Sequence, residues 1–397
     1  MLVQMTRPSV LVLTPLQMLL AVFACTATSV ILGAQPMLIG LYSDHLHLDL
    51  KQNGWLLSTE QLGGVCGAII GYWLAARIRW SLVMGAACVA AVVLNLASGY
   101  VDDFRQILAT RFLCGLSTVI AYTVAMYVLS HAAKPDRAFG LLLVAQGLLS
   151  SAYIMLVPLL NQRFGYAATV GSHAWWLVAV LISIVRLPAG GGGAELSEAR
   201  GIASRDARPI VGLAALVGGF LLQLSAYAVW GFLEQVGRRN GLADVTIGYA
   251  IGLGSLAGTP AAFIPVILGA SFGRLWLIAG ATTCFVASYA GLSEPLNFTS
   301  LMLWVCVLNV GWVVGLPYYM ALTVIHDSGG RFTRLMPFAQ ILAAAVGPAC
   351  SAVFISGEQL WPMFLVAAIA VSAGLLAVAG ASILGESSRT VKRADKS

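Results

Sequence analysis

The chain has 397 residues, of which 59% are hydrophobic and only 10% are charged. Soluble domains carry about a quarter charged residues. This composition therefore excludes an ordinary water-soluble protein and indicates that most of the chain is surrounded by lipid. The formal net charge of +6 would suit an acidic partner, but the distribution of the basic residues explains it more simply, as described below.

Twelve apolar runs are long enough to cross a membrane, because a spanning helix needs about 20 apolar residues. In chain order they cover residues 16–41, 53–76, 80–101, 104–130, 138–161, 165–187, 210–236, 246–270, 274–293, 298–324, 334–356 and 360–384. The first run is too long for a cleaved signal peptide and no small-residue cleavage site follows it, so we expect it to remain as a helix. The sequence thus predicts an all-α membrane protein with twelve transmembrane helices.

The basic residues are divided unequally between the two ends of these runs. With the N-terminus placed in the cytoplasm, 16 of the 22 Lys and Arg residues lie on the cytoplasmic side, five lie on the opposite side, and Arg111 lies within a run. Because cytoplasmic loops carry an excess of Lys and Arg, we predict that both termini are cytoplasmic. The positive net charge then reflects topology, and we expect no nucleic-acid partner.

One long polar interruption separates the runs into two sets of six. It contains four consecutive glycines, mixed charges and bounding prolines, a composition typical of a flexible linker. We predict an N-terminal six-helix bundle over 1–187, a cytoplasmic linker over 188–209, a C-terminal six-helix bundle over 210–385 and a cytoplasmic tail over 386–397.

The two sets of six resemble each other at a constant offset of 194 positions. At this offset Arg137 matches Arg331, and the dipeptide that ends in Gln146 matches the one that ends in Gln340. A six-helix unit repeated in one orientation is a plan of secondary transporters, whose substrate site lies near the bilayer midplane between the repeats. The repeat therefore predicts two pseudo-symmetric bundles around a central site.

Three local stretches resemble the major facilitator superfamily. The stretch GYWLAARIRW (71–80) is similar to the family's loop between helices 2 and 3, with Gly71, Arg77 and Arg79 retained but an Ala in place of the motif's Asp. RFLCG (111–115) resembles the start of the family's fourth-helix motif, and KPDRAFG (134–140) sits where the family places a charged loop before helix 5. The helix-5 pattern expected of proton-driven exporters is absent.

This resemblance implies a monomeric secondary transporter in a bacterial inner membrane, in contact with the lipid bilayer. Such a protein would move a small-molecule substrate by rocking its two halves, with protons as the coupling ion, and would be neither an enzyme nor a holder of a cofactor or metal. Three alternatives stay open, namely an efflux pump for hydrophobic compounds, an importer of an organic anion anchored by Arg111, and a sensor or scaffold that moves no solute.

Two opposite charges lie at similar depth in neighbouring runs, Glu60 in the second and Arg111 in the fourth. An ionised side chain inside a membrane helix is costly and usually faces protein or a water-filled cavity. We therefore expect the two to pair, either as a static tie within the N-terminal half or as a site where Glu60 exchanges a proton. Their counterparts at the repeat offset are Gly254 and Val305, so the pair is a specialisation of one half.

Amide and aromatic residues on the same runs are candidates to line a central cavity, because a few polar groups among rings suit an organic solute. They are Gln35, Gln146, Gln223, Tyr227, Trp230, Asn309, Trp312 and Gln340. For Gln146 and Gln340, hydrogen bonding between helices is the competing interpretation.

Small residues recur at four-residue spacing in the second and eighth runs. Gly63 and Gly67, together with Gly254 and Gly258, would allow close approach of another helix. We expect these glycines to form packing surfaces between the two halves. In the eighth run Pro260 would interrupt the backbone hydrogen bonds and kink the helix.

Overall fold

The computed structural model describes residues 13–132, 135–188, 190, 208–327, 330–355 and 359–394, and these residues are mostly helical. The helices of the first half are α1 (Pro15–Leu46), α2 (Leu50–Ala75), α3 (Trp80–Ser98), α4 (Phe104–Leu129), α5 (Pro135–Val170) and α6 (His173–Ile184). Those of the second half are α7 (Pro209–Trp230), α8 (Leu233–Arg239), α9 (Asp244–Gly258), the 3₁₀ turn η1 (Thr259–Ala262), α10 (Phe263–Leu268), α11 (Arg274–Leu292), α12 (Phe298–Ile325), α13 (Arg331–Phe354) and α14 (Trp361–Ala394). Most of the predicted linker lies outside the described residues.

Within the described part of the chain, ten helical segments are long and apolar enough to cross a membrane. Two predicted spans fall short of that standard. One is α2, which carries Glu60, Gln61 and other polar residues among its apolar ones, and the other is α6, a shorter apolar helix. The fifth span is joined to the next turn of helix across Gly165, whose backbone (φ 77°, ψ 177°) is not helical. Gly165 tolerates this conformation because it has no β-carbon.

The repeat predicted from the sequence extends to the helix boundaries. α3 and α11 both begin and end at equivalent positions of the two repeats, and α1, α2 and α4 begin at positions equivalent to the starts of α7, α9 and α12. The eighth span breaks at Pro260, where α9 gives way to the 3₁₀ turn and then α10, as expected when proline removes a backbone donor. The architecture is therefore two six-helix halves of the same design.

Polar residues at the starts of helices explain several of these boundaries. The side chain of Asp49 accepts a hydrogen bond from the backbone of Gln52 at the start of α2, and that of Asp103 accepts two at the start of α4. Asn297 caps α12 in the same way. Such caps satisfy backbone N–H groups that have no partner within the helix.

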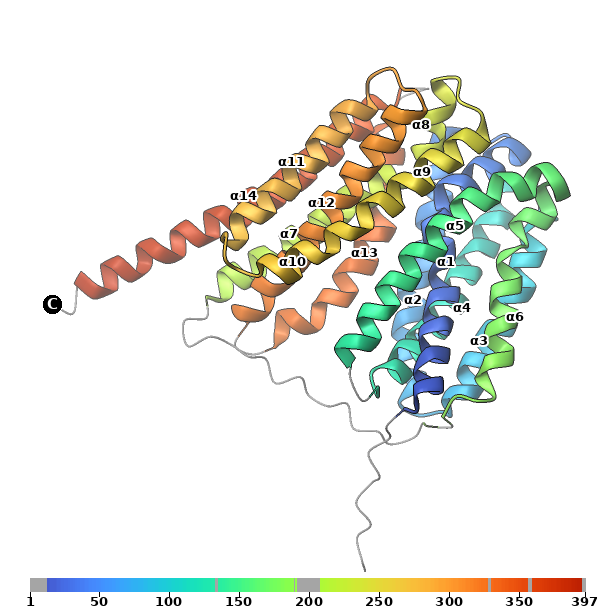
Figure 1. The fold of residues 1–397 in the computed structure, drawn as a ribbon, viewed down its shortest axis with the longest axis horizontal. Coiled ribbons are helices and arrows are strands. Elements are labelled where there is room, and N and C mark those ends of the chain that lie inside the picture. The colour runs from blue at the N-terminus through green and yellow to red at the C-terminus, as the bar shows by residue number, and fades with distance from the viewer. Residues whose placement is uncertain are drawn as a thin grey trace, which may run out of the picture.

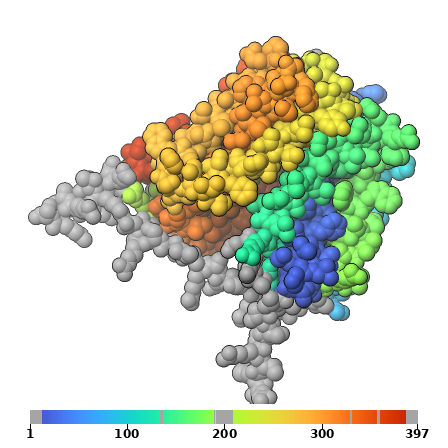
Figure 2. All heavy atoms as spheres, in the orientation of Figure 1, coloured from blue at the N-terminus to red at the C-terminus, as the bar shows by residue number. Residues whose placement is uncertain are grey.

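The two halves meet through helix pairs that the repeat relates to each other. α2 contacts α13, and α5 contacts α9; Figure 2 shows α5 (green) lying against α9 (yellow) on the face in view. Glycines bring the backbones together in both pairs. A β-carbon added at Gly54 of α2 would overlap Ala352 and the Pro348 carbonyl of α13, and one added at Gly252 of α9 would overlap Met155 and the backbone of α5.

These close contacts lie toward one end of the molecule, which carries α8 and the turn between α1 and α2. We call it the α8 end. Toward the opposite end the ribbon of α10 diverges from that of α5 in the view of Figure 1. The tightest glycine contacts between the halves thus lie in the parts of α2 and α9 nearer the α8 end. The C-terminal part of α14 runs on to Ala394, into the segment predicted as a tail, and projects away from the bundles (Figure 1).

The expectation that the spaced glycines pack between the halves is wrong. Gly63 and Gly67 lie against the α4 backbone at Phe112 and Leu116, so they join α2 to α4 within the first half. Gly254 and Gly258 likewise lie against α12, within the second half. Glycine spacing identifies the face of a helix that packs closely, but it does not identify which helix packs there.

Candidate functional site

Glu60 and Arg111 form an ion pair inside the first half. The Arg111 Nε donates to Glu60 Oε2 at 3.3 Å, and Nη2 contacts Glu60 Oε1. The remaining terminal nitrogen, Nη1, donates to Asn95 Oδ1 of α3 at 3.1 Å. A buried charge is tolerable only when it is paired and hydrogen-bonded, and Arg111 meets this condition with partners from two neighbouring helices.

The two members of the pair differ in exposure. Arg111 is 1% exposed, whereas the Glu60 side chain is 13% exposed. The guanidinium carbon lies 5.8 Å from the centre of the Tyr42 ring on α1. The arginine is thus enclosed by α1, α2, α3 and α4, and in this conformation its guanidinium is not open to a solute.

Close packing of α2 on α4 makes the pair possible. A β-carbon added at Gly115 would overlap the backbone carbonyl of Glu60, and Gly63 is equally close to the α4 backbone. Small residues at such positions let two membrane helices approach closely. The sequence predicted the pair but missed Asn95. The signal that could have identified Asn95 is the presence of a polar amide within an otherwise apolar run.

The predicted cavity glutamines fall into two classes. Gln35 and Gln223 are buried in α1 and α7, the repeat-related first helices of the two halves. Gln35 Nε2 and Gln223 Oε1 have no hydrogen-bond partner among the described residues. A buried polar atom without a partner is costly, so a solute that reached either atom would gain a hydrogen bond there.

The other predicted amides have partners within the protein. Gln146 donates to Ser29 Oγ at 2.8 Å, and Asn309 donates to the Val305 carbonyl at 2.9 Å. Gln340 contacts the sulfur of Met320 at 3.7 Å. Gln146 therefore forms a hydrogen bond between two helices, and Asn309 forms one within its own helix.

Three predicted aromatic residues form one cluster between α7 and α12. The Trp312 ring packs edge-on against Tyr227, with ring centres 5.1 Å apart, and against Trp230 at 6.2 Å. Such T-shaped pairs are favourable arrangements of aromatic rings. The structure therefore brings Tyr227, Trp230 and Trp312 together, in the half opposite the ion pair.

The loop motif between α2 and α3 is positioned by packing and by cation–π contact. Gly71 lies against Ile120 and Thr123 of α4. The Arg77 guanidinium lies 4.3 Å from the centre of the Trp73 ring, and Arg79 precedes the first residue of α3. These residues lie at the end of α2 remote from α8.

A second group of charges, which the sequence analysis missed, lies at the α8 end. Arg238 contacts Asp44 of α1, Glu234 of its own helix and Asp244 of α9. The Arg238–Asp44 ion pair joins the two halves. A signal was present in the sequence, because Asp44 and Arg238 stand 194 residues apart and so occupy equivalent positions in the two repeats. We call these four residues the arginine cluster.

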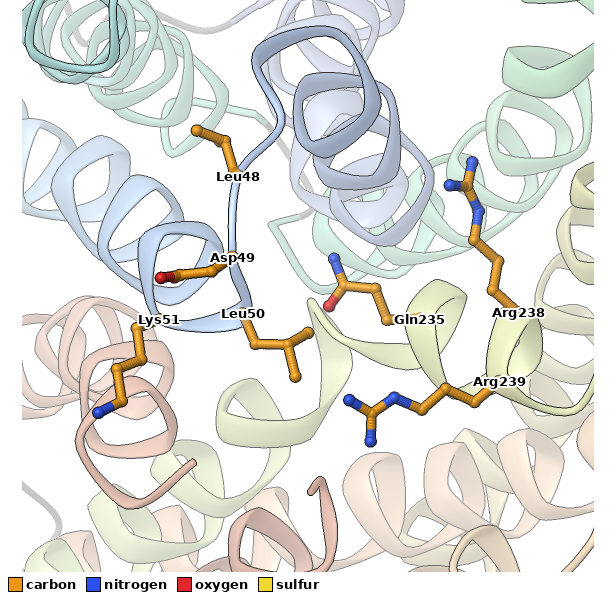
Figure 3. Close-up of a pocket in the computed structure, with 7 residues that line it drawn as sticks. All are labelled: Leu48, Asp49, Leu50, Lys51, Gln235, Arg238 and Arg239. Atoms are coloured by element: carbon orange, nitrogen blue, oxygen red, sulfur yellow. The ribbon is translucent and has the colours of Figure 1, made fainter. Parts of the chain in front are cut away.

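A cavity of about 670 Å³ adjoins the arginine cluster. Figure 3 shows Leu48 and Asp49 of the α1–α2 turn and the first two residues of α2, Leu50 and Lys51, on one side and three residues of α8 on the other. The side chains of Gln235 and Arg239 point toward the α1–α2 turn. The side chain of Arg238 points in a different direction, away from the turn and from the other two side chains. The cavity lies between the two halves, and Arg238 forms part of its wall.

Comparisons with known proteins agree on one family. The family model described as Major Facilitator Superfamily matches residues 18–334. The arabinose-proton symporter of Escherichia coli (strain K12) is 29% identical over 166 residues, which are 40% of this chain and 34% of the relative. The galactose-proton symporter of the same strain is 27% identical over 161 residues, 40% of this chain and 32% of the relative. The matches thus span about a third of each relative's length.

Solved structures resemble the whole chain at low identity. A mutant form of the nucleoside transporter NupG has a TM-score of 0.74 at 12% identity and covers 92% of this chain and 99% of its own. A peptide transporter, POT, in complex with sulfate has a TM-score of 0.71 at 13% identity and covers 93% and 95%. These likenesses establish the fold of two six-helix halves. The family match and the apolar helices together show that this chain is an integral membrane protein of the Major Facilitator Superfamily.

Proposed function

We propose that this protein is a secondary transporter that moves a small polar organic solute by opening its two ends in turn. The observation that carries the proposal is the way the halves meet. Their contacts, α2 with α13 and α5 with α9, are related by the repeat, and the tightest glycine contacts, at Gly54, Gly248 and Gly252, lie in the parts of α2 and α9 nearer α8. Halves joined in this manner can rock about the contact and expose a site between them to either side.

The orientation in the membrane follows from the distribution of basic residues. The loop that carries Arg77 and Arg79 lies at the end remote from α8, and an excess of such residues marks the cytoplasmic side. We infer that the α8 end faces outward. The structure then corresponds to a conformation closed to the outside.

Coupling to protons is proposed to involve Glu60. A carboxylate within a membrane helix is a functional candidate by default, and Glu60 is the member of the ion pair with some exposure. Protonation of Glu60 would release Arg111 to its remaining partner, Asn95, and so change the packing among α2, α3 and α4. The curated relatives are named as proton symporters, which favours symport.

The solute class we propose is a neutral polyhydroxylated molecule of the size of a pentose or hexose. The unpartnered amide atoms of Gln35 and Gln223 offer one donor and one acceptor, and the Trp312 cluster offers ring faces and edges. The relatives carry arabinose and galactose in their names. Enclosure of Arg111 by Glu60 and Asn95 disfavours an organic anion anchored at that residue.

The test is uptake by the purified protein in proteoliposomes, with labelled arabinose, galactose, a nucleoside and a dipeptide as the panel. With the outside more acidic than the inside, we expect accumulation of a sugar above its equilibrium level. Glu60→Gln should abolish accumulation driven by the pH gradient while leaving counterflow exchange. Glu294→Gln, in an exposed connection, is the matched control and should behave as wild type.

Two results would overturn the proposal. Sugar uptake that does not depend on the pH gradient would show that transport is not coupled to protons. Accumulation by Glu60→Gln equal to that of wild type would show that Glu60 has no role in the coupling. Binding of none of the panel, with binding of hydrophobic cations instead, would favour an exporter.

A further inference from the structure

At the α8 end one guanidinium, that of Arg238, contacts three carboxylates. Arg238 donates to both oxygens of Asp44, at 2.7 Å for the Nη2–Oδ2 bond. It donates to both oxygens of Asp244, at 3.0 and 3.1 Å. It also contacts Glu234. With every group ionised, the cluster would carry a net charge of −2, because one guanidinium faces three carboxylates.

Glu234 is by far the most buried of the three carboxylates. The residue is 0% exposed, and neither of its carboxyl oxygens has a hydrogen-bond partner among the described residues. Its carboxyl lies directly against Gly40 of α1, where an added β-carbon would overlap it. Gly40 is the repeat counterpart of Glu234, as Asp44 is of Arg238. The Glu234 side chain therefore lies between the two halves, where α1 contacts α8.

Other charged groups surround the cluster from each neighbouring element. They are His45 of α1, Asp49 and Lys51 at the start of α2, and Arg239 of α8. His45 is engaged by Asp102 at 3.0 Å, and Asp49 caps α2. Lys51 and Arg239 line the cavity on whose wall Arg238 lies (Figure 3).

We propose that Glu234 is a proton-binding residue in a gate at the α8 end, and that its protonated form holds the gate closed. When the halves are together, the neutral carboxyl tolerates burial against Gly40 and leaves Arg238 to Asp44 and Asp244. When the proton leaves, a buried anion that shares its cationic partner, Arg238, with Asp44 and Asp244 favours separation of α8 from α1, which hydrates the carboxylate. This inference rests on the proposed alternation of the two ends but not on the role of Glu60.

The direction of the pH effect follows from burial. α8 lies outside the candidate membrane spans, and desolvation raises the pKa of the Glu234 carboxyl to about 8, with Arg238 opposing the shift. Once the gate opens, water returns the pKa toward its ordinary value. The closed state thus binds the proton more tightly, is favoured below about pH 8, and loses that advantage as the pH rises through 8.

The experiment measures the gate directly and needs no substrate. Spin labels would be placed at Tyr100 and Pro295, exposed residues in the α8-end connections of the two halves, after replacement of the seven native cysteines. Distances between the labels would be recorded at several pH values by double electron–electron resonance. We expect the ratio of closed to open populations to fall about tenfold between pH 7 and pH 9.

Variants separate titration from mere packing. Glu234→Gln should stay closed at both pH values, Glu234→Asp should keep a pH response with a changed midpoint, and Asp44→Asn should open the gate at both. Glu294→Gln should respond as wild type. Glu60→Gln should also keep the response, so loss of proton-driven uptake in that variant and loss of gate titration are distinguishable.

The proposal is overturned if the wild-type distances do not change between pH 7 and pH 9. It is also overturned if Glu234→Gln keeps the wild-type pH response, or if Glu60→Gln abolishes that response and thereby assigns the titration to the other carboxylate.

Discussion

Gly115 of α4 lies against the backbone carbonyl of Glu60, so the closest approach of α2 to α4 occurs at the residue that pairs with Arg111. The Gly115 position has no room for a β-carbon. Backbone packing and charge pairing are therefore a single arrangement, in which the glycine sets the helix separation that the ion pair requires.

Gly115→Ala should accordingly destabilise the first half. The added methyl group forces α2 away from α4, a case of overpacking that costs on the order of 1–3 kcal/mol, and it stretches the contacts of Arg111 with Glu60. Thermal unfolding of the detergent-purified protein should show a lower midpoint. Gly280→Ala is the control, because nothing lies within 4 Å of a β-carbon there; its midpoint should equal or exceed that of wild type. Equal midpoints for the two variants would contradict the argument.

The ion pair itself should show strong non-additivity. Glu60→Ala leaves the Arg111 charge buried with Asn95 as its remaining partner, and removal of one member of a buried pair costs about 3–5 kcal/mol. The double variant Glu60→Ala, Arg111→Leu removes both charges and should be more stable than Glu60→Ala alone. The measurement is a double-mutant cycle on unfolding midpoints. Additive losses would show that the two side chains contribute independently.

Much of the fold could be predicted from the sequence, because lipid restricts the possible structures so strongly. Apolar runs became helices, and the offset between the sequence repeats reappears in the helix boundaries. Glu60 and Arg111 could be matched because a charge in an apolar run needs a partner at its own depth. These predictions succeed because they depend on the polarity of a residue relative to its neighbours in the sequence, which can be read without knowing the structure.

Other parts of the site could not be predicted in this way. In the arginine cluster, Asp44 and Arg238 occupy equivalent positions of the two repeats but are residues of different type. A search for internal repeats looks for identical residues and therefore does not find them. Asn95 was missed because its importance depends on facing Arg111, a matter of helix rotation. The partners of Gly63 and Gly254 were misassigned for the same reason, since spacing along a helix does not fix which neighbour it meets.

Gln35 and Gln223 should affect solute binding more than stability. Each has an amide atom without a partner among the described residues, so Gln35→Ala or Gln223→Ala gives up little internal hydrogen bonding at these atoms. A lost hydrogen bond to a solute is worth about 1 kcal/mol, which corresponds to a several-fold weaker affinity. Thermal shift with the solute found in the uptake panel would measure it.

Gln146→Ala serves as the contrasting variant for this test. Its amide already donates to Ser29, so the substitution should lower the unfolding midpoint of the solute-free protein without a selective loss of affinity. A larger affinity loss for Gln146→Ala than for Gln35→Ala would place the solute beside α5 instead.

Gly54→Val should hold the α8 end open. Gly54 is the point at which α2 touches the Pro348 carbonyl and Ala352 of α13, so a branched side chain there pushes on the contact between the halves and leaves each half intact. Labels at Tyr100 and Pro295 should report longer distances at every pH, with a modest change in the unfolding midpoint. Because rocking transporters need both closures, counterflow exchange should slow.

The comparison with Gly63→Ala makes this prediction specific. Gly63 presses on the α4 backbone within the first half, so its substitution acts on the packing of that half and not on the contact between halves. The unfolding midpoint should fall while the label distances stay at their wild-type values. The two glycines lie on the same helix, yet substitution of Gly54 should change the equilibrium between open and closed conformations, whereas substitution of Gly63 should lower the stability. Equal changes in distance for both variants would mean that the halves do not move as separate bodies.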